Sequence, residues 1–274
     1  MQRLLITAGA AALALAASGA AQAQDWTGGY VGGHVGYSTA DSDGNERILF
    51  DTDQDGRFDD TVNTTAPANA FSPGFCNAGA RTNAPGGGCT EDDDSWDFGL
   101  RAGYDKQFGR FVIGGVAEVS RQELEDSVSG FSTTPASYTM TREVDWTVGL
   151  RVRGGVAFDK FLIYGTAGPS YAKIKSSFRT TNGANAFTER GDDEGTWGYQ
   201  AGFGGEMKVT ERVTLGLEYL FNSYEDDSYR VRASQGTAPA TNPFILVDPT
   251  GTDFKRSDSD FDFSSIRFTA AYRF

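Results

Sequence analysis

An acidic stretch, DTDQDGRFDD, occupies residues 51–60 and has the spacing of a metal-binding loop. It matches the D-x-D-x-D-G start of a calcium loop, in which alternate carboxylates supply oxygen ligands and the glycine allows a sharp turn. The candidate calcium ligands are Asp51, Asp53, Asp55 and Asp59. The twelfth position of such a loop is normally a bidentate glutamate, but here it is Val62. Two interpretations therefore stand, a partial calcium site and a solvated acidic loop.

Five charged residues occupy matching positions in separate segments, and these are Arg101, Glu118, Arg151, Glu218 and Arg267. Each lies where apolar and polar residues alternate, about five to seven residues from a short turn. Arg101 and Glu118 differ in sign, and so do Glu218 and Arg267. Because an isolated buried charge is strongly penalised, such residues must pair if they face one enclosed space. We expect a belt of salt bridges that blocks this space, with a narrow gated ion path as the alternative.

The single histidine, His34, raises the question of enzyme activity. A catalytic histidine needs a nucleophile or a carboxylate beside it, and the sequence marks no such partner for His34. Phosphate-loop, zinc and dinucleotide-binding signatures are absent from the sequence. We therefore predict a hydrogen-bonded interior histidine, no enzyme activity and no cofactor apart from calcium in the acidic stretch.

Eight segments with period-two alternation are the elements that must position these residues. They are Gly28–Ala40, Ser95–Phe108, Phe111–Arg121, Thr141–Ala157, Phe161–Ser177, Gly195–Val209, Val213–Tyr224 and a terminal strand from about Asp262. The two faces of 161–177 are hard to distinguish, because apolar residues occur on both. The pattern predicts an all-β protein of one domain.

The connections between these segments alternate in length. Three are short, and they lie at 108–110, 158–160 and 210–212. Four are long and polar, at about 41–94, 122–140, 178–194 and 225–261. Short turns at one end and long loops at the other are typical of an eight-stranded, antiparallel, up-and-down transmembrane β-barrel. The alternative is a soluble barrel that binds a ligand inside, since alternation does not say which face is outside.

Aromatic placement favours the membrane interpretation. Trp96, Trp146 and Trp197 lie 12, 11 and 12 residues from the short-turn ends of their segments. With a tilt of about 40°, this separation is about 25–30 Å, the height of an apolar band in a membrane. Tyr272 and Phe274 lie at the opposite interface. We predict two aromatic girdles that include Trp96, Trp146, Trp197, Tyr272 and Phe274.

The first residues predict export. Residues 1–23 combine Arg3, an apolar stretch and a small-residue ending, as a signal peptide does. The barrel domain would then be residues 24–274. The net charge of −13 disfavours nucleic-acid binding. Cys76 and Cys89 are expected to form a disulfide in an oxidising compartment, which would restrict the unfolded chain by roughly 3 kcal/mol.

Two short motifs resemble a known family. WTGGYVGGHVGYS (26–38) is similar to the opening strand of opacity-type or immunogenic porin-like outer-membrane proteins. AAYRF at the C-terminus resembles the aromatic-ended strand that the barrel-assembly machinery recognises. The resemblance implies a monomeric, eight-stranded barrel in the outer membrane of a Gram-negative bacterium. The implied partners are membrane lipid, lipopolysaccharide and the assembly machinery.

The functional expectation is a structural or surface-interaction role. The barrel would display four acidic loops, for which the sequence names no surface ligand. A small-solute, porin-like channel is the first alternative, and a lipid-modifying barrel enzyme is the second.

Overall fold

The computed structural model describes residues 25–41, 44–92, 94–191 and 195–274. The expected signal peptide, residues 1–23, lies outside these ranges. Within them the chain forms thirteen strands, and each pairs antiparallel with its neighbours. No helix in these ranges is long and apolar enough to cross a membrane.

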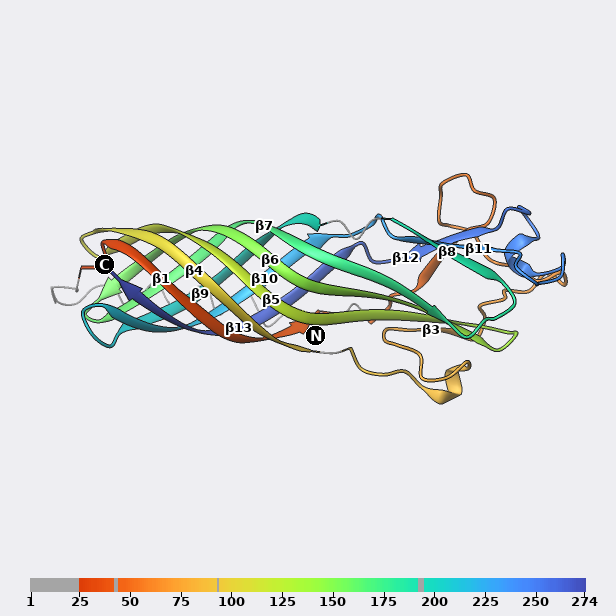
Figure 1. The fold of residues 1–274 in the computed structure, drawn as a ribbon, viewed down its shortest axis with the longest axis horizontal. Helices are drawn as coiled ribbons and strands as arrows, with labels where there is room; N and C mark the ends of the chain where they lie inside the picture. The colour runs from red at the N-terminus through yellow and green to blue at the C-terminus, as the bar shows by residue number, and fades with distance from the viewer. Residues whose placement is uncertain (1–24, 42–43, 93, 192–194) are drawn as a thin grey trace.

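Eight strands close into a barrel, drawn at the left of Figure 1. They are β1 (Gly28–Ala40), β4 (Ser95–Phe108), β5 (Phe111–Ser132), β6 (Ala136–Phe158), β7 (Phe161–Thr180), β9 (Gly195–Lys208), β10 (Val213–Glu225) and β13 (Asp260–Arg273). Each pairs with the next barrel strand along the chain, and β1 pairs with β13 to complete the ring. The predicted up-and-down barrel is therefore confirmed.

The turns at one end of the barrel are tight. Phe108 pairs directly with Phe111, and Phe158 pairs with Phe161. Gly109 and Asp159 have positive φ values of 61° and 50°, as residues in such two-residue turns do. The last residue lies at this end too, where the Phe274 amide donates to the Gly29 carbonyl at 3.0 Å.

Strands β5, β6 and β7 are longer than the sequence predicts. The prediction of a loop over 122–140 is wrong, because β5 and β6 continue as a hairpin to Ser132 and Ala136. Polar residues fill much of this extension, so its alternation is weak. Leu124, Val128 and Phe131 are nevertheless buried. The hairpin projects beyond the barrel toward the right of Figure 1.

The remaining strands lie beside this hairpin. A second sheet has the order β2 (Ile48–Asp51), β12 (Thr252–Arg256), β11 (Arg230–Ser234) and β8 (Ala186–Arg190). β3 (Gly74–Cys76) pairs with the far part of β5, and short 3₁₀ turns occur at Pro85–Gly87 and Pro243–Ile245. We call these elements, together with the extensions of β5 to β7, the cap.

The cap has its own apolar core. Its buried residues are Ile48, Phe50, Val62, Ala70, Phe71, Val128, Ala136, Tyr138, Met140, Val231, Ala233, Phe244 and Phe254. The sequence analysis also treats the other three long connections, 41–94, 178–194 and 225–261, as polar loops. This is wrong, because each of them contains at least one strand. Short apolar runs such as ILF and PFI are too brief to show periodicity, but together they bury one common surface. The long connections therefore fold as one unit.

Two irregularities in pairing change which side chains face inward. The register shifts between Val144 and Trp146 in β6 and between Arg121 and Leu124 in β5. Such a bulge moves the following side chains to the other face. Alternation continued from the outward-facing Trp146 predicts Val144 on the outer face and Asp145 in the interior. Instead, Val144 is fully buried inside, and Asp145 pairs with the exposed side chains of Arg121 and Lys175.

Candidate functional site

The five predicted charged residues meet in the middle of the barrel. Glu118 accepts from Arg151 at 3.1 Å and from Arg267 at 2.6 Å, and its Oε2 lies 4.0 Å from Arg101 Nε. Glu218 accepts from Arg101 at 3.4 Å and from Arg151 at 3.2 Å. Asp97, which the sequence analysis did not single out, completes this ring by accepting from Arg267. Three arginines therefore face three carboxylates, and the ring has no net charge.

A second charged layer lies closer to the short turns. Arg153 donates to Asp105 and, at 2.6 Å, to Glu206, while Arg273 donates to Asp105 at 2.7 Å. The Arg153 guanidinium also lies 4.7 Å from the centre of the Tyr30 ring and 4.9 Å from that of Tyr164. Two arginines and two carboxylates again balance. The period-two alternation of β4 and β6 already indicates that Asp105 and Arg153 face the interior.

Apolar groups close both ends of these layers. Near the turns, Trp26 is fully buried with Val112, Ala157, Leu162 and Tyr164, and it lies under Arg273 and Lys208. Toward the cap, the interior is filled by Leu124, Val144, Ala172, Ile174, Tyr224, Phe261 and Phe263. No sequence pattern indicates these layers, because Trp26 precedes the first strand and the others lie next to bulges or near strand ends.

Burial shows how completely the interior is filled. The exposed fractions of Arg101, Glu118, Arg151, Glu218 and Arg267 are 3%, 5%, 1%, 1% and 0%. A water-sized sphere therefore does not reach most of their surface from either end. An eight-stranded barrel is only just wide enough for side chains, and here they occupy its interior.

His34 has partners that the sequence analysis missed. Its Nε2 lies 3.0 Å from Asp97 and 3.3 Å from Ser120, and its Nδ1 lies 3.6 Å from Glu118. The ring occupies space that opens only because residue 99 is glycine, where a Cβ would approach His34 Cε1 to 2.2 Å. Asp97 and Ser120 both approach Nε2. In a catalytic triad, by contrast, one ring nitrogen faces the serine and the other faces the aspartate. The arrangement suits an interior hydrogen-bonded histidine.

The outside of the barrel is apolar. Leu100, Val152 and Phe203 are each more than 60% exposed at mid-height. Trp96, Trp197 and Phe274 are 61%, 70% and 74% exposed, Tyr272 is 45% exposed, and Trp146 is half-buried. Tyr37 packs on Trp96, and Tyr171 packs between Trp146 and Trp197. Such a surface requires a lipid environment, because a soluble barrel would bury its apolar face.

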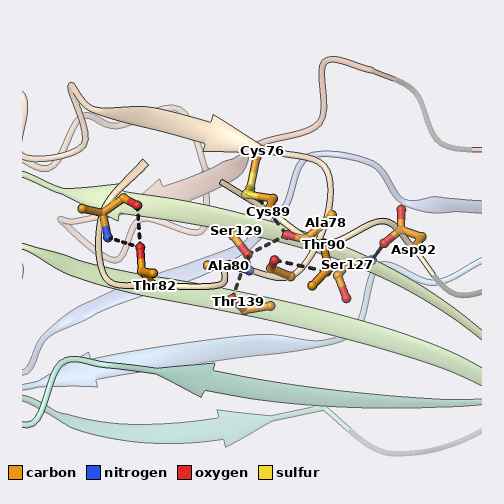
Figure 2. The surroundings of a disulfide bond; sticks show 12 residues. Cys76, Ala78, Ala80, Thr82, Cys89, Thr90, Asp92, Ser127, Ser129 and Thr139 are labelled. Atoms are coloured by element: carbon orange, nitrogen blue, oxygen red, sulfur yellow. Dashed lines mark hydrogen bonds between the residues drawn. A yellow bond between two sulfur atoms is a disulfide. The ribbon is translucent and has the colours of Figure 1, made fainter. Parts of the chain in front are cut away.

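A disulfide joins Cys76 and Cys89 in the cap (Figure 2). The loop that it closes is fixed to β5 by Ser129, whose hydroxyl donates to the Ala78 carbonyl and accepts from the Ala80 amide. Thr139 of β6 lies 2.7 Å from the same hydroxyl. The disulfide therefore closes the loop, and the hydrogen bonds of Ser129 tie it to the long hairpin.

Buried ion pairs join β12 to the long hairpin of β5 and β6. Arg256 of β12 donates to Glu46 and to Asp126, and Arg142 of β6 donates to Asp126 at 2.9 Å. Burial, and then the negative charge of the nearby Asp126, raise the pKa of Asp92 to about 6. Burial likewise raises the pKa of Glu46, although the Arg256 guanidinium opposes this shift.

The acidic stretch begins in β2 and closes on itself. The Asp60 amide donates to the Phe50 carbonyl at 3.1 Å, so the stretch forms a loop. Carboxylate oxygens of Asp51, Asp53 and Asp60 lie within 4.8 Å of one another. Asp55 instead accepts from the Arg57 amide, and Asp59 is exposed and outside this group. Burial raises the pKa of Asp51, and the nearby Asp55 and Asp53 carboxylates add to this shift.

A closed antiparallel barrel with an apolar exterior and an ion-paired interior is the architecture of a transmembrane β-barrel. The family model described as "Outer membrane protein beta-barrel domain" matches residues 8–274. The chain belongs to this family and is an outer-membrane protein of Gram-negative type.

Named relatives agree with this membership. The chain is 30% identical over 125 residues to a 31 kDa outer-membrane immunogenic protein of Brucella melitensis, covering 45% of this chain and 51% of that protein. It is 28% identical to a 22 kDa outer membrane protein of Rhizobium leguminosarum, covering 60% and 69% of the two chains. The chain thus spans about half the length of the first of these relatives.

One solved structure aligns over most of its length. The outer membrane protein OprG from Pseudomonas aeruginosa aligns with a TM-score of 0.43 and 15% identity, covering 92% of this chain and 98% of that one.

Proposed function

We propose that the protein is a non-enzymatic outer-membrane barrel with a salt-bridged plug, which holds a folded cap at the cell surface. The plug consists of Arg101, Glu118, Arg151, Glu218 and Arg267 together with Asp97. The near-complete burial of these charges is the observation that carries the proposal. Their mutual pairing gives each ion a partner in place of water.

The cap is the part of the protein that we assign to surface interaction. It extends beyond the end of the barrel where β4 and β9 begin, close to Trp96 and Trp197, and it contains most of the polar connections. Its own apolar core makes its outer surface a defined shape rather than a set of independent loops. Membrane lipid and lipopolysaccharide would surround the barrel below it, and the assembly machinery would insert the chain through its terminal strand.

A small-solute channel is the second candidate. The observation that favours it is that Arg101 and Arg151 each keep Nε and Nη1 without a hydrogen-bond partner among the described residues. Internal water molecules would satisfy these donors, and a continuous file of them would make a narrow path. The apolar layers around Trp26 and Leu124 oppose such a path.

Planar-bilayer recording tests the plug. Purified protein is expected to give no steady conductance, because side chains fill the barrel at three heights. A wide porin inserted under the same conditions is the control for incorporation. Steady conductance on the order of a nanosiemens from the monomer contradicts the plug, since an eight-stranded barrel with a filled interior has no such opening.

A separate experiment tests whether the protein modifies lipid. Overexpression in an outer membrane is expected to leave the mass of lipid A unchanged. A mass shift that disappears in a His34→Gln variant would contradict the non-enzymatic role, because His34 and its partners would then be catalytic.

A further inference from the structure

We propose that the loop at residues 50–60 binds one calcium ion through the carboxylates of Asp51, Asp53 and Asp60, on the outer side of the membrane. The site lies in the cap, at the end of β2, and is separate from the barrel interior. The ligand set differs from the one that the spacing of the sequence predicts, because Asp60 replaces Asp59 and Asp55 takes no part.

The first support is the approach of three like charges. One oxygen from each carboxylate lies within 4.8 Å of the other two. Oxygens that share a calcium ion lie about 2.3–2.6 Å from it, so any two of its ligands are at most about 5.2 Å apart. Three carboxylates repel one another at this separation unless a cation lies between them.

The second support is independent of the clustering. Asp51 is only 3% exposed, and its Oδ1 has no hydrogen-bond partner among the described residues. Its other oxygen accepts from the Gly56 amide at 3.0 Å. A buried carboxylate oxygen without a partner is strongly penalised, and coordination to a cation removes that penalty.

Arg232 and Arg57, two arginines close to the loop, are engaged with other carboxylates, and Arg230 and Lys255 lie over the Phe58 ring. Arg232, across the sheet from β2, donates from two nitrogens to Asp253, which pairs in register with Asp51. The Arg57 side chain is 78% exposed and approaches Asp55, not the cluster. No arginine in the described part of the loop therefore neutralises the three carboxylates.

Hydrogen bonds within the loop explain why Asp60 and not Asp59 joins the cluster. The Asp60 amide bonds to Phe50, and its Oδ2 accepts from both the amide and the hydroxyl of Thr52, at 2.7 and 2.8 Å. These contacts turn the Asp60 carboxylate inward. Asp59, one residue earlier, faces outward and is exposed.

Ligand number sets the expected affinity. Three carboxylates without a bidentate glutamate resemble the weaker extracellular calcium sites, whose dissociation constants are about 10⁻⁴ to 10⁻³ M. Such a site fills where calcium is millimolar, as it is outside a cell. The ion would hold the loop against the start of β12. There the Gln54 side-chain amide already donates to the Thr250 hydroxyl and the Gly251 carbonyl.

Calorimetry with calcium chloride and the folded protein in detergent micelles tests the site. Wild-type protein is expected to bind one ion per chain, and Asp53→Asn and Asp60→Asn to weaken binding by about tenfold or more. Asp59→Asn and Asp55→Asn are the matched controls, because they remove equal charge from the same loop, and they are expected to bind as wild type does. Gel mobility of the unboiled variants checks that each barrel is folded.

Proteolysis provides a second readout. Trypsin cleavage after the exposed Arg57 is expected to slow by about tenfold in millimolar calcium for wild type, but not for Asp60→Asn. Absence of heat from wild type up to about 10 mM calcium would overturn the proposal. It would also be overturned if Asp59→Asn lost as much affinity as Asp60→Asn, since binding would then reflect only the total charge of the loop.

Discussion

Asp92 shows how position in the fold alters a single ionisable group. It lies in the last part of the first long connection and accepts from the Ser127 amide at 3.0 Å. Burial, and then the charge of Asp126, raises its pKa to about 6. The carboxylate form is thus disfavoured in the folded cap relative to the unfolded chain.

The sign of the resulting pH dependence follows from linkage. A carboxyl whose folded pKa is raised binds its proton more tightly when folded, so the folded cap gains stability as pH falls from above 6 toward 4. Because Asp92 is only partly buried, we expect a gain of about 1 kcal/mol. Urea denaturation of the cap, monitored by circular dichroism at a series of pH values between about 4 and 7.5, measures this dependence.

Asp92→Asn isolates the contribution of this residue. Glu46 and Asp226 also have raised pKa values, so only the difference between wild type and variant reports on Asp92. That difference should shrink as the pH is lowered below 6. Identical pH profiles for both proteins would mean that Asp92 does not contribute.

Among the elements, strand β12 has the largest role in holding the cap together. Its Phe254 is 1% exposed and its ring packs against those of Phe50, Tyr138, Phe178, Phe187 and Phe244. Two residues later, Arg256 makes the ion pairs that join β12 to Glu46 and to Asp126 of the hairpin. A five-residue strand therefore supplies both an apolar and an ionic contact.

Phe254→Ala is expected to destabilise the cap by about 3–5 kcal/mol, because it removes a buried ring at the centre of the core. The barrel should be unaffected, since the rings that pack on Phe254 belong to the cap. Tyr138 and Phe178 are among them, and they lie in the extensions of β6 and β7. Resistance of the cap to chymotrypsin across a temperature series measures the loss. The matched control is Val247→Ala, a cap residue that is 61% exposed and should change stability little. Equal protease resistance in both variants would contradict the assigned core.

For the molecule as a whole, the barrel and the cap depend on different stabilising forces. The barrel is a closed ring of paired strands in lipid, where unpaired backbone groups are very costly. The cap is held by an apolar core in water, ion pairs and one disulfide.

We therefore expect unfolding in two stages. Reduction of Cys76–Cys89 followed by protease should remove or nick the cap, and the barrel should keep the fast gel mobility of an unboiled sample. Boiled protein, with slower mobility, is the control. Loss of the fast-migrating form as soon as the cap is cut would show that the two parts unfold together.

The sequence by itself determined the barrel. Period-two alternation fixes which residues of each strand meet lipid, and short turns fix which strands are neighbours, so Arg101 lies opposite Glu118 in the register as expected. Alternation is a local property, and a residue such as Leu150 shows its outward direction through its immediate neighbours.

Only the tertiary structure decided the cap, the bulge at Asp145 and the choice of Asp60 over Asp59. The cap core joins residues far apart in the chain, such as Phe71 and Phe244, whose short apolar segments carry no periodicity of their own. A bulge reverses the faces without changing the composition, and one backbone bond between Asp60 and Phe50 decides which carboxylate turns inward. These outcomes depend on long-range contacts, which a local pattern does not contain.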